Sequence, residues 1–185
     1  MILTGDWYAD LYILENALDA VQFYSGTERK KMLKNANQKH LKDSGSMLYG
    51  LTWRGYLSPT KSRTKDPATG LYRTKVMDLH PELDDLFKEF SKMYFPDFAW
   101  SQVQMNKNYL CPPHRDSKNI GESVLISLGD YKGGLTCVDI NNKIEKFDSR
   151  HRPIRFDGSR HLHWVEPYEG KRYSLVFFNN YKKAK

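Results

Sequence analysis

The chain has 185 residues, 39% hydrophobic and 14% aromatic, which is enough for one domain with a core and excludes a disordered tail. No apolar run reaches the roughly 18–20 residues of a membrane span, and the start MILTGDWYADLY lacks a signal peptide's basic segment. Cys111 and Cys137 could pair, but two free thiols in a reduced chain are favoured. We expect one intracellular, monomeric domain, cytoplasmic or, in a eukaryote, nuclear, with supporting elements over 1–97 and a core over 98–181.

The net charge of +7 is concentrated in one part of the chain. Residues 27–75, called the basic segment below, hold twelve Lys and Arg against three Asp and Glu, a net charge of +9, so the rest of the chain carries −2. Such a concentration suits a polyanion, and we expect nucleic acid, DNA in the first place, as the partner. The alternative is a solvated basic face without a partner.

The first half of the chain is expected to be irregular and partly helical. Residues 8–24 have a helix-like pattern, and 27–45 indicate a polar helix that Thr27 caps and Gly45 ends. A strand is expected over 46–56, and a long mobile loop with five basic residues over 58–75. Residues 80–95 predict an amphipathic helix whose apolar stripe packs in the core. The stripe is Leu83, Leu86, Phe87 and Phe90.

From residue 98 the pattern changes to short strands separated by turns. Strands are expected within 98–110, 123–129, 135–140, 143–147, 153–156, 161–166 and 172–181, with a turn over 130–134 at DYKGG. Many short strands of this kind predict a sandwich or jelly roll in the α+β class. The preceding helices would brace one sheet from outside.

The stretch PPHRDSKNIGES, residues 112–123, places His114 and Asp116 two positions apart. In an extended segment residues i and i+2 point the same way, so an imidazole and a carboxylate would be presented together. Two histidines and one carboxylate on one face of Fe(II) leave positions open for a cosubstrate and oxygen. The pair alone occurs often by chance, so a further histidine is needed.

The stretch HLHWVEPYEGKRYSLVFF, residues 161–178, supplies that histidine. His161 and His163 face the same side of an expected strand, and Arg172 and Ser174 follow. If the last strand runs antiparallel beside the histidine strand, Arg172 and Ser174 point into the same barrel. There the guanidinium could clamp a carboxylate with two parallel hydrogen bonds. The alternative is a surface arginine on an edge strand.

With these motifs, residues 98–181 resemble the Fe(II)- and 2-oxoglutarate-dependent dioxygenases, whose fold is a double-stranded β-helix, a cupin-like jelly roll. The resemblance implies that His114, Asp116 and a distal histidine bind iron and that Arg172 binds the distal carboxylate of 2-oxoglutarate. HWVEPYEGKRYSL is similar to the terminal motif of prolyl-hydroxylase-type members, and its spacing selects His163 over His161. His161 is then a residue behind the ligands, a substrate contact, or simply a strand residue.

The first motif, PPHRDSKNIGESVLISLGDYKGG, resembles the TET/JBP group, which oxidises the 5-methyl group of pyrimidines in nucleic acid. Asn119 occupies the position that lies near the target base in that group, and Arg115 between the ligands also matches. Asn119 is equally allowed as a turn residue before Gly121. NKNY at 106–109 resembles a strand with polar contacts to 2-oxoglutarate, which makes Asn108 and Tyr109 candidates.

The resemblance implies Fe(II), 2-oxoglutarate and O2 as reactants, ascorbate as a candidate reductant, and hydroxylation of 5-methylcytosine or thymine. A base in a duplex would have to flip out, while the basic segment, with Arg63 and Lys65 in its loop, grips phosphates. Tyr72, Tyr56 or Trp53 could stack on the base. Alternatively these aromatic residues pack in the core, an interpretation that is stronger for Trp53.

Three other functions stay open from sequence. A prolyl-hydroxylase-like protein hydroxylase matches the terminal motif but leaves the basic segment unexplained unless its substrate is acidic. An AlkB-like demethylase of nucleic acid would share the iron, the cosubstrate and the charge. A β-sandwich that binds nucleic acid without catalysis would make the histidine–aspartate pair accidental.

Overall fold

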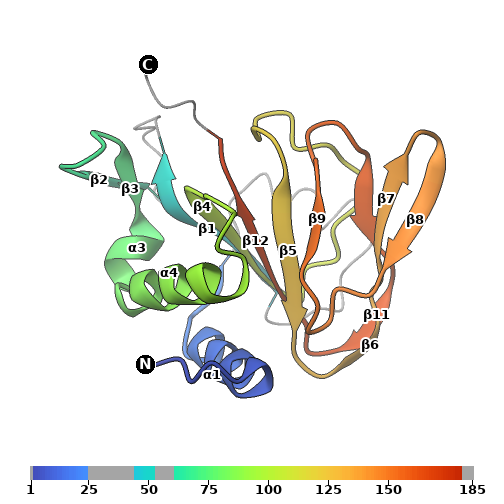
Figure 1. The fold of residues 1–185 in the computed structure, drawn as a ribbon, viewed down its shortest axis with the longest axis horizontal. Helices are drawn as coiled ribbons and strands as arrows, with labels where there is room; N and C mark the ends of the chain where they lie inside the picture. The colour runs from blue at the N-terminus through green and yellow to red at the C-terminus, as the bar shows by residue number, and fades with distance from the viewer. Residues whose placement is uncertain (1, 25–43, 53–60, 181–185) are drawn as a thin grey trace.

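The computed structural model describes residues 2–24, 44–52 and 61–180. Figure 1 shows two β-layers, with helices on the outer side of the larger one. The helices are α1 (Trp7–Asp19), α3 (Lys75–Leu79) and α4 (Glu82–Tyr94). The strands are β1 (Gly45–Thr52), β2 (Lys61–Lys65), β3 (Tyr72–Thr74), β4 (Gln102–Lys107), β5 (Ser123–Leu128), β6 (Tyr131–Gly133), β7 (Thr136–Ile140), β8 (Lys143–Phe147), β9 (Ile154–Phe156), β10 (His163–Val165), β11 (Tyr168–Gly170) and β12 (Tyr173–Phe178).

The larger sheet has the order β2-β3-β1-β4-β12-β5-β9, and the strand pairs within it are antiparallel. The second layer consists of the sheet β10-β7-β8 and the strand pair β11-β6. Alternation gives β4 two faces: Val103 and Met105 are buried in the core, while Gln104 and Asn106 point to the opposite side. Two facing antiparallel sheets of this kind confirm the predicted jelly roll.

Helices α1 and α4 cover the outer face of the larger sheet, as predicted (Figure 1). Asp6 caps α1 by accepting a hydrogen bond from the Ala9 amide. The predicted apolar stripe of α4 is buried in the same core cluster as the apolar residues of α1. In the three described ranges no helix has both the length and the hydropathy that crossing a membrane requires.

Two local expectations are wrong, and one condition stated from the sequence is not met. The loop expected over 58–75 contains the antiparallel pair β2–β3, because Asp66 and Thr69 form a hydrogen-bonded turn between the strands. The turn expected at DYKGG contains β6, which pairs with β11. The last strand does not lie beside the histidine strand, because β12 pairs with β4 and β5 whereas β10 pairs with β7.

Some of the predicted features lie outside the described residues. They include most of the polar helix expected over 27–45, together with Trp53 and Tyr56. The residue expected to end that helix, Gly45, is the first residue of β1.

Candidate active site

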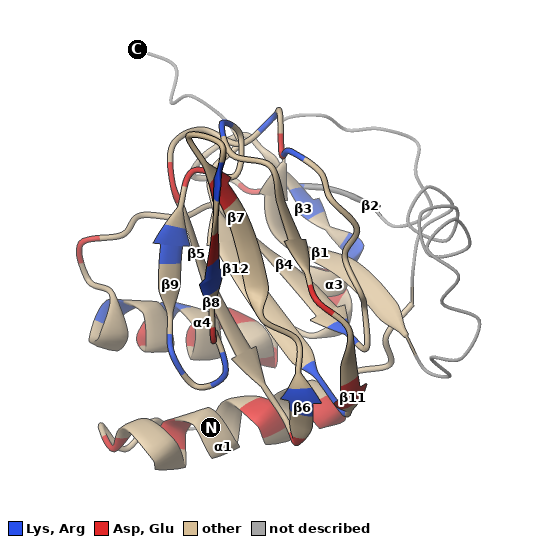
Figure 2. Ribbon diagram, turned by 90° about the vertical axis from the view of Figure 1, so that its right-hand side faces the viewer, with Lys and Arg blue, Asp and Glu red and all other residues tan. Residues whose placement is uncertain are grey.

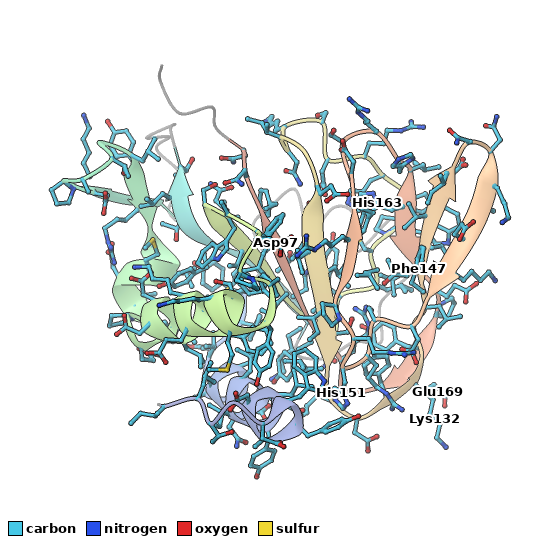
Figure 3. All side chains as sticks on the ribbon, in the orientation of Figure 1. Asp97, Lys132, Phe147, His151, His163 and Glu169 are labelled. Atoms are coloured by element: carbon cyan, nitrogen blue, oxygen red, sulfur yellow. The ribbon has the colours of Figure 1, made fainter. Side chains whose placement is uncertain are left out.

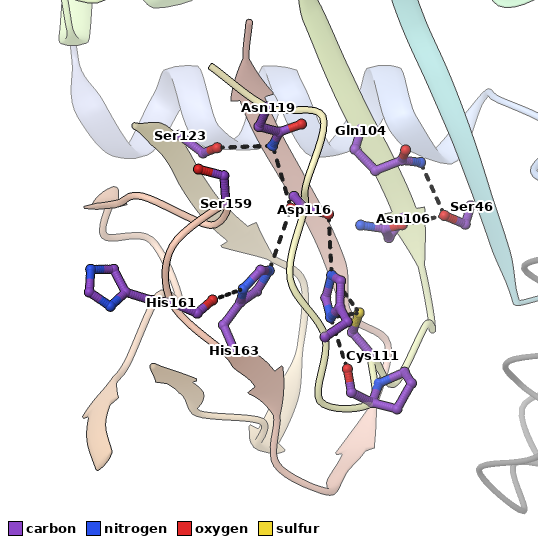
Figure 4. A network of polar contacts seen from close by, with 12 residues as sticks. Ser46, Gln104, Asn106, Cys111, Asp116, Asn119, Ser123, Ser159, His161 and His163 are labelled. Carbon is purple, nitrogen blue, oxygen red and sulfur yellow. Dashed lines mark hydrogen bonds and ion pairs between the residues drawn. The ribbon is translucent and has the colours of Figure 1, made fainter. Parts of the chain in front are cut away.

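His114, Asp116 and His163 come together in space, and Figure 4 shows Asp116 and His163 side by side. His114 and His163 form an isolated bridge in which each amide donates to the other residue's carbonyl at 3.0 Å. Asp116 Oδ1 lies 3.5 Å from His114 Nε2, and its Oδ2 lies 3.5 Å from His163 Nε2. The three ligand atoms lie within 4.8 Å of one another. This is the ligand set that non-heme Fe(II) enzymes use.

Hydrogen bonds to backbone carbonyls orient both imidazoles. His114 Nδ1 lies 2.9 Å from the Pro112 carbonyl, and His163 Nδ1 lies 3.0 Å from the His161 carbonyl. A carbonyl can only accept, so Nδ1 carries the proton in each ring. In the neutral imidazole the Nε2 lone pair is then available to a metal, which is the usual arrangement behind a ligating histidine.

The charges of the site also suit a cation. Burial raises the pKa of Asp116, but hydrogen bonds to both histidines outweigh it and hold that pKa well below its ordinary value. Burial lowers the pKa of His114, yet the hydrogen bonds to Asp116 and to the Cys111 thiol raise it to about 10. Without a metal His114 is therefore protonated at neutral pH, and a metal ion would have to displace the proton from Nε2. Asp116 is therefore ionised at neutral pH, as metal ligation requires.

Gly158 allows a loop to approach these ligands closely. Its carbonyl accepts a hydrogen bond from the Asp116 amide at 2.8 Å. A Cβ at this position would lie 3.2 Å from His163 Cε1 and 3.3 Å from Asp116 Oδ2. A side chain here would press on the carboxylate and on one imidazole, so these groups would have to shift by a few tenths of an ångström.

The three ligands line a cavity of about 320 Å³, a size suited to a small ligand or a single base. The register of β12 against β4 defines two ends of this region. Tyr173 pairs with Lys107 at one end, beside Arg172, and Phe178 pairs with Gln102 at the other. We call these the arginine end and the amide end. Lys132 on β6 and Glu169 on β11 lie next to the arginine end. Figure 3 shows that His163 lies at a distance from both of these residues.

At the arginine end, Arg172 is 2% exposed. Its Nη2 donates to Ser127 Oγ at 2.8 Å, and its guanidinium carbon lies 5.4 Å and 5.6 Å from the ring centres of Tyr131 and Tyr168. Within the part of the chain that the structure describes, Arg172 Nε and both tyrosine hydroxyls lack a hydrogen-bond partner. Burial raises the pKa of Tyr168 to about 12, so its hydroxyl keeps its proton. Three buried donors without an acceptor suit a carboxylate.

The backbone and side chain of Arg172 are held in place from two sides. The Arg172 amide donates to Asn108 Oδ1 at 3.0 Å, and the Asn108 amide donates to the Arg172 carbonyl at 2.8 Å. Ser127 Oγ lies 2.6 Å from Ser149 Oγ, which lies 3.3 Å from Thr136 Oγ1 in the cavity wall. Asn108 therefore supports Arg172 rather than lining the cavity.

Ser174 and Tyr109, also predicted near the cosubstrate, do line the cavity. Ser174 Oγ accepts a hydrogen bond from Asn106 Nδ2 at 3.1 Å, and Asn106 in turn accepts from Ser46 (Figure 4). Ser174 thus belongs to a polar wall that β1, β4 and β12 build together.

The residues predicted to contact substrate divide into two groups. Asn119 and Arg115 line the cavity, together with Lys118, which was not predicted. Asn119 Nδ2 lies 3.4 Å from Asp116 Oδ2, and Arg115 Nε donates to the Arg160 carbonyl at 3.2 Å. Asn119 is also a turn residue, because its amide donates to the Asp116 carbonyl at 2.8 Å.

The other predicted contacts lie elsewhere. His161 Nδ1 lies 3.0 Å from the Asp139 carbonyl, so this ring turns away and only the His161 backbone serves His163. Tyr72 and Lys65 lie on the β2–β3 hairpin, where the Lys65 ammonium is 5.2 Å from the Tyr72 ring centre, and neither lines the cavity. Arg63 lies on β2, outside the residues whose side chains are described.

Sequence reasoning missed the tyrosines of the arginine end and the carboxamides of β4. Tyr131 lies in the stretch predicted as a turn and Tyr168 lies between two predicted strands, whereas both belong to short strands that pair with each other. Gln102, Gln104 and Asn106 follow the period of two expected for one strand face. That alternation was visible in the sequence, but it does not say which face meets a cavity.

No family model matches the chain, and no curated protein does. Solved structures of similar fold include "NgTET1 in complex with 5mC DNA", with 15% identity over 87% of this chain and 71% of that one and a TM-score of 0.49. A second is a Pseudomonas putida prolyl-4-hydroxylase, with 10% identity over 95% of this chain and 86% of that one and a TM-score of 0.48. A third is an oxidoreductase of the 2OG-Fe(II) oxygenase family from Burkholderia pseudomallei, with 18% identity over 82% of this chain and 80% of that one and a TM-score of 0.43. These likenesses are too weak to carry an argument, so both the fold and the reaction are argued from the residues of this chain.

Proposed function

We propose that the protein is an Fe(II)- and 2-oxoglutarate-dependent dioxygenase that hydroxylates the 5-methyl group of a pyrimidine in nucleic acid. One observation carries the reaction class. A cavity that holds two histidines and a carboxylate in metal-binding positions lies next to a buried arginine with unpaired donors around it.

The donor sets fit both reactants. His114, Asp116 and His163 would hold Fe(II) through two imidazole nitrogens and a carboxylate oxygen. Arg172, with the Tyr131 and Tyr168 hydroxyls, would hold the distal carboxylate of 2-oxoglutarate. When bound, iron, 2-oxoglutarate and O2 supply the oxidation that converts a C–H bond to C–OH, with release of succinate and carbon dioxide.

The protein's own part is to position the reactants and to limit water. The backbone bonds of Pro112 and His161 fix the two imidazoles, and Asn108 and Ser127 fix Arg172. Such fixed geometry accelerates a reaction by keeping the reacting groups in place. Apolar residues between the two ends narrow the water-accessible space. They are Leu125, Val176 and Phe156.

Cations at the cavity mouth support an anionic polymer as substrate. Arg115 and Lys118 line the mouth and are exposed, and Arg160, which contacts Arg115, is exposed as well. Asp116 is the acidic residue among those that line the cavity, and it belongs to the metal centre. Figure 2 shows acidic residues along α1 and basic residues on β6 and β9. Arg115, Lys118 and Arg160 favour phosphate contacts around the mouth, and the basic segment adds to the positive charge of the chain.

Nucleoside mass spectrometry tests the proposal. The protein is incubated with Fe(II), 2-oxoglutarate and DNA or RNA containing 5-methylcytosine and thymine, with His163→Ala as the inactive control. We expect a 5-hydroxymethyl nucleoside that the control does not form. Succinate release without a modified base would support the iron site but refute the 5-methylpyrimidine as substrate, and it would point to N-methylated bases or to peptides.

A further inference from the structure

The amide end of the cavity carries side chains that the reaction itself does not use. Carboxamides gather there: Gln102 on β4, Asn119 after the metal-binding loop, and Asn180 after β12. Backbone contacts bring these segments together, because the Ile120 amide donates to the Asn179 carbonyl at 2.7 Å and Gln102 pairs with Phe178. Three amides from three segments therefore line the part of the cavity farthest from Arg172.

Two of these amides are incompletely hydrogen-bonded. Within the described ranges, Gln102 Oε1 and Asn180 Oδ1 are buried and have no donor. The orientation of Gln102 is fixed, because its Nε2 donates to the Leu51 carbonyl. Its oxygen must therefore face away from β1, and the whole residue is 0% exposed. A buried acceptor without a partner is costly, and it indicates a ligand that brings the donor.

A pyrimidine supplies such a donor in only one of the two candidate forms. The substituent at C4 is adjacent to the 5-methyl group, so it enters the same part of the cavity. In 5-methylcytosine this substituent is an amino group that donates, whereas in thymine it is a carbonyl that accepts. Against an amide oxygen, the first makes a hydrogen bond and the second leaves two acceptors facing each other.

We propose that Gln102 is a specificity-determining residue that accepts a hydrogen bond from the 4-amino group of the base, so that the enzyme oxidises 5-methylcytosine in preference to thymine. This inference rests on the proposed function and adds to it the identity of the base. A site built to hydrogen-bond a substrate group rejects an analogue that lacks the group far better than an apolar pocket does. We expect a preference of about ten- to hundredfold in kcat/KM.

The test combines a substrate change with a protein change. Three single-stranded oligonucleotides differ only in the target base: 5-methylcytosine, thymine, or 5-methyl-2-pyrimidinone, which lacks the 4-amino group. Single strands remove differences in the cost of flipping. The proteins are wild type, Gln102→Met and Gln104→Met. Gln104 is the matched control, because its Nε2 also donates to β1, at Met47 O and Ser46 Oγ.

Loss of the amino group from the substrate should lower kcat/KM of the wild type about ten- to hundredfold. The same loss should change kcat/KM of Gln102→Met very little, because the variant lacks the acceptor. Gln104→Met should affect all three substrates alike, and thermal melting checks the folding of each variant. Equal wild-type turnover of thymine and 5-methylcytosine, or an equal loss on all bases in Gln102→Met, would overturn the inference while leaving the proposed function intact. No product from any base would overturn the proposed function, and this inference with it.

Discussion

Replacement of Arg172 by lysine should weaken 2-oxoglutarate binding without unfolding the protein. Lysine keeps the positive charge but loses the planar group that donates to Ser127 and lies between the rings of Tyr131 and Tyr168. The loss of one hydrogen bond to a charged group costs about 1.5–3 kcal/mol, which corresponds to about a ten- to hundredfold rise in Kd.

Isothermal titration of 2-oxoglutarate into the Fe(II)-loaded protein without oxygen measures this change directly. Arg155→Lys is the matched control, because Arg155 is an arginine held by two 2.7 Å hydrogen bonds to Asp97 at the surface. We expect the control to bind like wild type. Unchanged affinity in a folded Arg172→Lys protein would refute the assignment of the arginine end to the cosubstrate.

Three further predictions concern the metal, acid stability and nucleic acid. Asp116→Asn should abolish turnover and lower Fe(II) affinity at least about tenfold, measured by metal titration, because the charged ligand between the histidines is lost; wild-type affinity would contradict it. Asp10 accepts hydrogen bonds from Thr4, Gly5 and Tyr94, which outweigh burial and hold its pKa below the ordinary value. This contribution to stability should be complete above pH about 4, the ordinary pKa of an unfolded aspartate, and lost as pH falls through the lower folded pKa. Asp10→Asn should therefore lower the free energy of unfolding in urea at pH 7 and less so at pH 2, and an equal loss at both would contradict this. Arg115→Gln and Lys118→Gln should each lower the slope of log DNA affinity against log salt concentration by about one phosphate contact, whereas Lys88→Gln on α4 should leave that slope unchanged. Unchanged slopes in the first two variants would exclude Arg115 and Lys118 from the DNA interface.

The candidate metal ligands could be predicted from sequence because their motifs are short. His114 and Asp116 are two residues apart, and Arg172 follows His163 by nine positions. The choice of His163 over His161 agrees with the geometry, since the ring of His161 turns toward Asp139. Local spacing is independent of which strands become neighbours, so these assignments survive errors in topology.

Features that depend on long-range pairing could not be predicted in the same way. The sequence does not say that β12 inserts between β4 and β5, so it could place Arg172 in the barrel only on the condition that the last strand lies beside the histidine strand. Tyr131 and Tyr168 meet only because β6 pairs with β11. The unpaired oxygen of Gln102 depends on the contact with Leu51 across β1 and β4.

The central claim is that this chain couples consumption of 2-oxoglutarate to hydroxylation of a base. The most direct measurement quantifies succinate and hydroxymethyl nucleoside in the same reaction, with and without Fe(II), 2-oxoglutarate or O2, for wild type and Asp116→Asn. We predict that both products form together in the wild type, that omission of any one reactant removes both, and that Asp116→Asn forms neither. A hydroxylated base formed without 2-oxoglutarate, or in the Asp116→Asn protein, would contradict the account.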